Sequence, residues 1–143
     1  MNSDRLLLNE IYYGSINAIS VISSYLDKIK DYDMFNTLFD TLTAYRKIAN
    51  KAVVLLGEQG GTSTQSFFQK ASAHTVRQII AITSSESYIN GLLIRGSTDQ
   101  IRDIISYINT CTDAKKETRA LAYSLIELEE ENIRVLKKYQ KFV

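Results

Sequence analysis

The stretch that decides the fold is LAYSLIELEEENIRVLKKY, residues 121–139. Its apolar residues recur at alternating spacings of four and three, which places them on one face of an α-helix. That face carries Leu121, Leu125, Leu128, Asn132, Val135, Tyr139 and Phe142. The opposite face carries Glu127, Glu130, Glu131, Arg134 and Lys138. We therefore expect an amphipathic helix from about residue 114 to the C-terminus, with Glu130 and Arg134 paired at a spacing of four.

Three other long segments show the same periodicity, at residues 4–29, 33–56 and 85–109. Ser3 and Asp33 are the residue types that cap the first two of these helices. Short turns before residue 33 and at 110–113 join the segments in pairs, which predicts two antiparallel hairpins. The core-facing residues expected on these helices are Leu8, Tyr12, Ser15, Ile19, Ile22, Leu26 and Ile29, then Phe35, Leu38, Leu42, Tyr45, Ala49, Ala52 and Leu56, then Asn90, Ile94, Ser97, Ile101, Ile104 and Ile108.

The two hairpins are separated by Gly60-Gly61 and by residues 65–82, whose composition is helical. A helix continuous from residue 65 to residue 110 would be ~70 Å long, far longer than its neighbours, so we expect a break near residues 83–85. The chain contains no proline. These patterns predict one all-α domain over residues 1–143, an antiparallel four-helix bundle with an extra crossover helix between its second and third helices.

Composition bears on the possible partners and on the compartment. The 17 basic and 16 acidic residues nearly balance, which argues against nucleic-acid binding. The cations around residues 134–141 are interpreted as stabilising a helix C-terminus, with a basic contact surface as the alternative. No apolar run approaches the ~20 residues of a membrane span, and no secretory segment opens the chain. Cys111 is the single cysteine, which favours a cytoplasmic location, with an intermolecular disulfide as the alternative.

Metal chemistry is the activity best known for such bundles, and this sequence lacks its ligands. The usual template is a glutamate on two helices and Glu-x-x-His on the other two. The single histidine, His74, lies in the crossover segment. The second helix offers only Asp40 and Glu58, and residues 127–130 of the last helix are expected to face solvent. We therefore predict no catalytic, cofactor-binding or metal-ligating residues, and no cofactor.

Several residues break the expected pattern. Asn132 is a polar residue on an apolar seam, so we expect it to be buried, with Asn90 as its partner. A role in fixing register is favoured over ligand binding. We expect Gly14, Gly91 and Gly96 to lie where helices approach closely. The outer face of the first helix, Tyr13, Asn17, Ser20, Ser24 and Asp27, is nearly uncharged and is either ordinary surface or a subunit contact.

Three stretches carry a resemblance to a known group of proteins: residues 45–52 (YRKIANKA), 94–98 (IRGST) and 129–139. They resemble an uncharacterised bacterial family of ferritin-like four-helix bundles, over the whole chain. The resemblance implies a ferritin-like fold and no established activity. Members of that family tend to carry a glutamate where this chain has Arg46, and methionines around the position of Gly96. These departures weaken a metal site further.

The functional expectation is a non-enzymatic, cytoplasmic helical-bundle protein that acts through self-association, as a homodimer, or through a protein partner. The Asn17, Ser20 and Ser24 face is the candidate contact. The alternative is a divergent ferritin-like binder of a metal or a small ligand. Neither nucleic acid nor membrane is an expected partner.

Overall fold

The computed structural model describes residues 2–58, 67–83 and 85–140, with the backbone alone for residues 67–73. Over these residues the chain is all helical, as predicted, with five helices and no strand. They are α1 (Ser3–Leu26), α2 (Tyr32–Glu58), α3 (Phe67–Ile82), α4 (Glu86–Thr110) and α5 (Lys116–Lys138). Gly60-Gly61 and Phe142 lie outside the described residues. None of the described helices combines the length and the apolar character that a membrane crossing requires.

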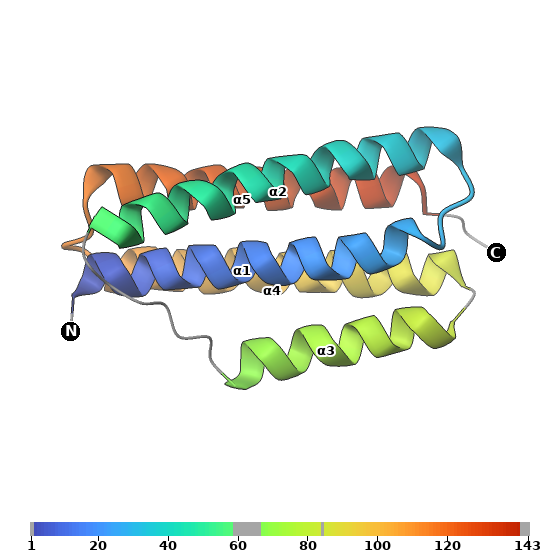
Figure 1. Cartoon of the computed structure of the whole chain (residues 1–143), viewed down its shortest axis with the longest axis horizontal. Coiled ribbons are helices and arrows are strands. Elements are labelled where there is room, and N and C mark those ends of the chain that lie inside the picture. Colours follow the sequence, from blue (N-terminus) through green and yellow to red (C-terminus); the bar gives the residue numbers. More distant parts are fainter. Residues whose placement is uncertain (1, 59–66, 84, 141–143) are drawn as a thin grey trace.

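The four long helices pack lengthwise against one another, and α3 lies outside them against α1 (Figure 1). Two hairpins, α1–α2 and α4–α5, make the most extensive contacts. They are joined by the packing of α2 on α5 and of α1 on both α4 and α5. Successive helices run in opposite directions, so α3 returns the chain to the end at which α4 begins (Figure 1). Helix α1 is therefore in contact with all four of the others.

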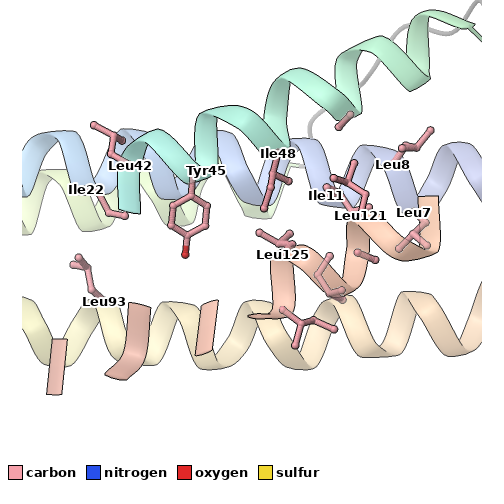
Figure 2. Packing of buried hydrophobic residues seen from close by; sticks show 14 of the residues in the cluster. Leu7, Leu8, Ile11, Ile22, Leu42, Tyr45, Ile48, Leu93, Leu121 and Leu125 are labelled. Atoms are coloured by element: carbon pink, nitrogen blue, oxygen red, sulfur yellow. The ribbon is translucent and has the colours of Figure 1, made fainter. Parts of the chain in front are cut away.

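Apolar side chains from the four long helices form one continuous core (Figure 2). The stripes predicted from periodicity face this core, and their apolar members include Leu8, Ile22, Leu38, Leu42, Ile104, Ile108, Leu121, Leu125 and Val135. Burial of one such side chain contributes roughly 1.5–3 kcal/mol relative to its exposure. Packing of the predicted amphipathic faces is therefore sufficient to explain why these four helices associate.

The expected break between the crossover helix and the next helix is present. Helix α3 ends at Ile82 and α4 begins at Glu86. The Ser85 hydroxyl accepts a hydrogen bond from the backbone N–H of Tyr88 at 3.2 Å. This N-cap satisfies an N–H group that has no partner within the helix, which fixes the start of α4.

Two of the predicted caps are wrong by one or two residues. Helix α1 is capped by Asn2 rather than by Ser3, and the Asn2 side chain accepts from a backbone N–H two residues later at 2.9 Å. At the start of α2, the carboxylate of Asp31 rather than that of Asp33 accepts from Met34 N, also at 2.9 Å. In both places more than one nearby residue could cap the helix, so composition alone could not choose between them.

The start of α5 is held by a residue distant in the sequence. Its N-cap residue, Lys115, makes no side-chain capping bond. Instead, Oδ1 of the buried Asp4 accepts from Lys115 N at 2.8 Å. The first turn of α1 thereby fixes the first turn of α5, two residues later in the chain than the periodicity predicted.

The glycines behave differently from the prediction of three close approaches. A Cβ atom built on Gly14 would lie 2.7 Å from the end of the Gln100 side chain, so Gly14 makes room for this side chain of α4. Gly91 and Gly96 are exposed, and a Cβ atom on either would meet nothing within 4 Å. The expectation for these two was wrong because no atom of another described helix lies within 4 Å of the position that a Cβ atom would take.

The uncharged outer face of α1 is partly an intramolecular contact. Tyr13, Asn17, Ser20 and Ser24 are half-buried, and only Asp27 is exposed. Helix α3 packs on α1, and Arg77 donates a hydrogen bond from Nη1 to the Ser20 hydroxyl at 2.8 Å. The surface predicted as a subunit contact is thus in part an intramolecular contact, with α3 bonded to it at Ser20.

Candidate functional site

A cluster of polar side chains lies inside the apolar core at the middle of the four long helices. The Tyr45 side chain projects inward from α2, and its hydroxyl oxygen points away from that helix into the interior (Figure 2). This hydroxyl donates a hydrogen bond to Glu129 Oε1 on α5 at 2.5 Å. Tyr45 is 0% exposed and Glu129 is 2% exposed. A carboxyl group is therefore held out of water with no cationic side chain bonded to it among the described residues.

Ser97 on α4 and Asn132 on α5 complete the cluster. Asn132 Nδ2 donates to the Ser97 hydroxyl at 3.0 Å, and Ser97 is also hydrogen-bonded to Glu129. Both residues are buried. Within the described part of the chain, Asn132 Oδ1 has no hydrogen-bond partner. A buried carbonyl oxygen without a hydrogen-bond partner costs about 1–3 kcal/mol. A hydrogen-bond donor placed next to Asn132 Oδ1 would remove this cost.

The surroundings of Glu129 favour its protonated form. Burial raises its pKa from the ordinary 4.5 to about 7, although hydrogen bonds from Tyr45 and Ser97 act in the opposite direction. Burial together with the nearby Glu129 carboxylate raises the pKa of Tyr45 well above its usual value, so this hydroxyl remains a donor. Glu129 is consequently a group that gains or loses its proton near neutral pH.

A pocket of about 330 Å³ adjoins this cluster, between α1 and α4. Glu129 and Asn132 from α5 form part of its wall, next to Ser97 from α4. Its apolar wall is made by Ala18, Val21 and Ile22 of α1, Leu92 and Leu93 of α4, and Val76 of α3. This volume is at the lower end of the roughly 300–1,000 Å³ usual for ligand sites. The pocket therefore has an apolar wall and a polar wall, and the amide side chains of Asn17 on α1 and Gln100 on α4 also line it.

The exposed part of the pocket lining lies on α4. Gly96, Arg102 and Asp103 are exposed lining residues, and Asp99 is half-buried. The Arg102 guanidinium lies 3.4 Å from an Asp99 carboxylate oxygen and 3.6 Å from one of Asp103. With Glu129 ionised, the lining therefore carries three carboxylates and one guanidinium that already faces two of them. The pocket lining is therefore net negative when Glu129 is ionised.

The structure confirms that Asn132 is buried on the α5 seam, but its partner is Ser97 and not Asn90. Asn90 accepts from the Tyr25 hydroxyl at 2.5 Å instead. The predicted register was wrong by at least one helical turn between α4 and α5. The turn between α4 and α5 extends to Lys115, so α5 begins later in the chain than the start at residue 114 that we predicted. This shifts α5 relative to α4, and Asn132 lies beside Ser97 rather than Asn90.

Burial of Glu129 was missed, since residues 127–130 were expected to face solvent. A signal was present in the sequence, because Glu129 follows Leu125 by four positions and precedes Asn132 by three. The other carboxylates considered do not join it: Asp40 and Glu58 are exposed, and so is His74. Among the described residues no group of three or more histidine, cysteine, aspartate or glutamate side chains could hold a metal ion. Cys111 is buried, which disfavours the alternative of an intermolecular disulfide.

The three stretches that carry the sequence resemblance meet in this cluster, because Tyr45, Ser97, Glu129 and Asn132 come from residues 45–52, 94–98 and 129–139. Comparisons of the chain with protein-family models, with curated proteins and with solved structures gave no match. The function is therefore inferred from the geometry of the pocket and its polar cluster.

Proposed function

We propose that this protein binds a small organic ligand in the pocket between α1 and α4, without catalysing a reaction. The observation that carries the proposal is the buried Asn132 carbonyl oxygen, which has no partner among the described residues, on a residue that lines a pocket of about 330 Å³. A group whose only role is to fix helix register is expected to be satisfied by its neighbours. A ligand donor would remove the cost of leaving this oxygen unpaired.

The helix arrangement supports the same proposal. Four long helices in two hairpins, with α3 following the first hairpin and preceding the second in sequence, are consistent with a ferritin-like bundle. Such bundles build their binding sites in the core from side chains on facing helices. Here the facing side chains are a phenol, an alcohol, an amide and a carboxyl group. That set suits an organic molecule with hydrogen-bonding groups better than it suits a transition metal, which prefers imidazole or thiolate ligands.

A matched pair of glycine substitutions can test the proposal. Gly96 lines the pocket, Gly91 does not, and both are exposed on α4 with open space around a new Cβ atom. Gly96→Leu would extend a side chain at the pocket lining, whereas Gly91→Leu would project it elsewhere. Both substitutions remove a helical glycine, so neither should impair folding.

The ligand probes are 1-hexanol, hexylammonium and hexanoate, which share one six-carbon chain. We expect at least one of them to bind the wild-type chain saturably, with amide NMR shifts concentrated at residues 17–22, 92–97 and 129–132. Gly96→Leu should abolish this binding and Gly91→Leu should preserve it. Absence of saturable binding for all three probes, or equal binding by both variants, would refute the proposed site.

Self-association is a second candidate, because α2 and α5 expose large apolar side chains. Val53, Val54 and Tyr123 are 49%, 60% and 50% exposed. The Tyr45–Glu129 bond fixes the antiparallel register of α2 and α5, and it places Tyr123 within about one helical turn of both valines. Sedimentation velocity at tens of micromolar protein should show a homodimer that Val54→Lys weakens. A wild-type monomer would exclude this candidate.

A further inference from the structure

We infer that the ligand of this pocket is a small organic amine, whose ammonium group is held by Glu129 and Asn132 and whose apolar part lies between α1 and α4. This inference rests on the proposed function and specifies the chemical class of the ligand. The proposed ligand is a free small molecule and not part of a protein partner, because the pocket volume of about 330 Å³ suits a fragment-sized compound.

The hydrogen-bonding capacity of the polar cluster carries the inference. Most donors of the cluster are engaged: Tyr45 donates to Glu129, one N–H of Asn132 Nδ2 donates to Ser97, and Ser97 is hydrogen-bonded to Glu129. The acceptor Asn132 Oδ1 is unused within the described residues, and a carboxylate oxygen accepts more than one hydrogen bond. The cluster therefore offers acceptors to a ligand and few donors. An ammonium group has three donors and no acceptor, which matches this demand.

The charge of the lining supports the same class of ligand. Asp99, Asp103 and an ionised Glu129 outnumber Arg102, whose guanidinium already faces the two aspartates. The lining residues contributed by α1 and α3 carry no charge. Tyr45 of α2 does not line the pocket, and its neutral hydroxyl donates to Glu129. An anionic ligand would meet repulsion from these carboxylates. A cation would be attracted, and its apolar tail would contact Val21, Ile22 and Leu93.

Proton linkage follows from this geometry. An ammonium group beside Glu129 would favour the ionised carboxylate, opposing the effect of burial, which raises its pKa to about 7. Amine binding should therefore be stronger at pH 8 than at pH 5.5, where Glu129 must release a proton for the ligand to bind. A neutral alcohol should show little dependence over this range.

Isothermal titration calorimetry with the three six-carbon probes, at constant ionic strength, tests the inference. At pH 8 we expect the wild-type chain to bind hexylammonium about tenfold or more tightly than 1-hexanol, because charge-assisted hydrogen bonds are the stronger kind. Hexanoate should bind more weakly than either. Glu129→Gln keeps the shape and accepts from Tyr45 but removes the charge, so it should remove the preference for hexylammonium over 1-hexanol. Glu130→Gln, an exposed carboxylate on the same helix, is the control and should keep the preference.

The outcomes distinguish the ligand class from the site itself. If 1-hexanol or hexanoate binds as tightly as hexylammonium, and Gly96→Leu abolishes that binding, the pocket stands and the amine assignment is wrong. If Glu129→Gln retains the full preference for hexylammonium, the assignment is also wrong. If ammonium chloride competes fully with hexylammonium, the site recognises a bare cation and not an organic amine. If no probe binds saturably, or binding persists in Gly96→Leu, both the site and the ligand class fail.

Discussion

The Tyr45 hydroxyl on α2 and the Glu129 carboxyl on α5, 84 residues apart, share a 2.5 Å hydrogen bond in a fully buried position. The bond fixes the register of these two helices and removes one donor from the cluster. It also holds a carboxyl group beside the pocket at a depth where its charge is disfavoured. The chain therefore accommodates in its core a group that a purely structural bundle would not need.

The stability of the protein should depend on pH through Glu129. Its pKa is about 7 in the folded chain and near 4.5 in the unfolded chain, so the folded state holds more protons between these values. The contribution of Glu129 to the free energy of unfolding should therefore be fully present below about pH 4.5 and lost as the pH rises through about 7, by roughly 2–3 kcal/mol. Urea unfolding at pH 5 and pH 8 measures this loss. Glu129→Gln should remove most of the difference in unfolding free energy between the two pH values, and Glu130→Gln should leave it in place. If the difference is unchanged in Glu129→Gln, groups other than Glu129 cause it.

Removal of the phenolic hydroxyl at position 45 should destabilise the fold in a pH-dependent manner. At pH 8 Tyr45→Phe deprives an ionised, buried carboxylate of a donor, which should cost ~1.5–3 kcal/mol. At pH 5 the carboxyl is protonated, and the cost should fall to ~0.5–1.5 kcal/mol. Tyr123→Phe, at a half-exposed tyrosine of α5, should change stability by less than ~0.5 kcal/mol. Equal losses at both pH values would contradict a bond to an ionisable partner.

The two kinds of glycine should respond differently to alanine. Gly91→Ala should raise the free energy of unfolding by ~0.5–1 kcal/mol, because it improves helix propensity and the new methyl group meets nothing. Gly14→Ala should gain less than this or lose stability, because its Cβ atom would displace Gln100, whose amide donates to Glu10 at 3.5 Å. Equal gains at both positions would show that the Gln100 side chain can move away from position 14 without cost.

The long-range cap at the start of α5 should be measurable. Asp4→Ala removes the acceptor for Lys115 N and should lower the free energy of unfolding by ~1–2 kcal/mol. Asp27→Ala is the matched control, because this exposed aspartate lies at the C-terminal end of the same helix. A carboxylate there opposes the helix dipole, so its removal should be neutral or slightly stabilising. A loss in Asp27→Ala as large as that in Asp4→Ala would indicate a general effect of charge on α1.

Periodicity sufficed to predict the helices and their buried faces, because each apolar stripe is a local property of its own segment. The stripe on α5 led correctly to burial of Asn132, although not to its partner. Pairing depends on the length of the turn and on the start of α5, and that start is set by Asp4, more than a hundred residues earlier. The contact of Arg77 with Ser20 was equally invisible, because no local pattern shows where α3 packs.

The site was harder to predict than the fold. Glu129 lies in phase with Leu125 and Asn132, yet a glutamate among four acidic residues is normally exposed. Only the inward-facing Tyr45 hydroxyl and Ser97 explain how its burial is tolerated. Sequence alone could therefore identify the position as core-facing but could not show what compensates it. The pocket itself depends on the spacing of α1 and α4, which no single segment determines.

The measurement that tests the central claim most directly is the titration of the Glu129 side-chain carboxyl, followed by ¹³C NMR and assigned with Glu129→Gln. The free protein should show a midpoint near pH 7. Saturating hexylammonium should move this midpoint to a lower pH, and the same concentration of 1-hexanol should not. A free-protein midpoint near 4.5, or one that hexylammonium leaves in place, would contradict a buried carboxyl that receives an amine.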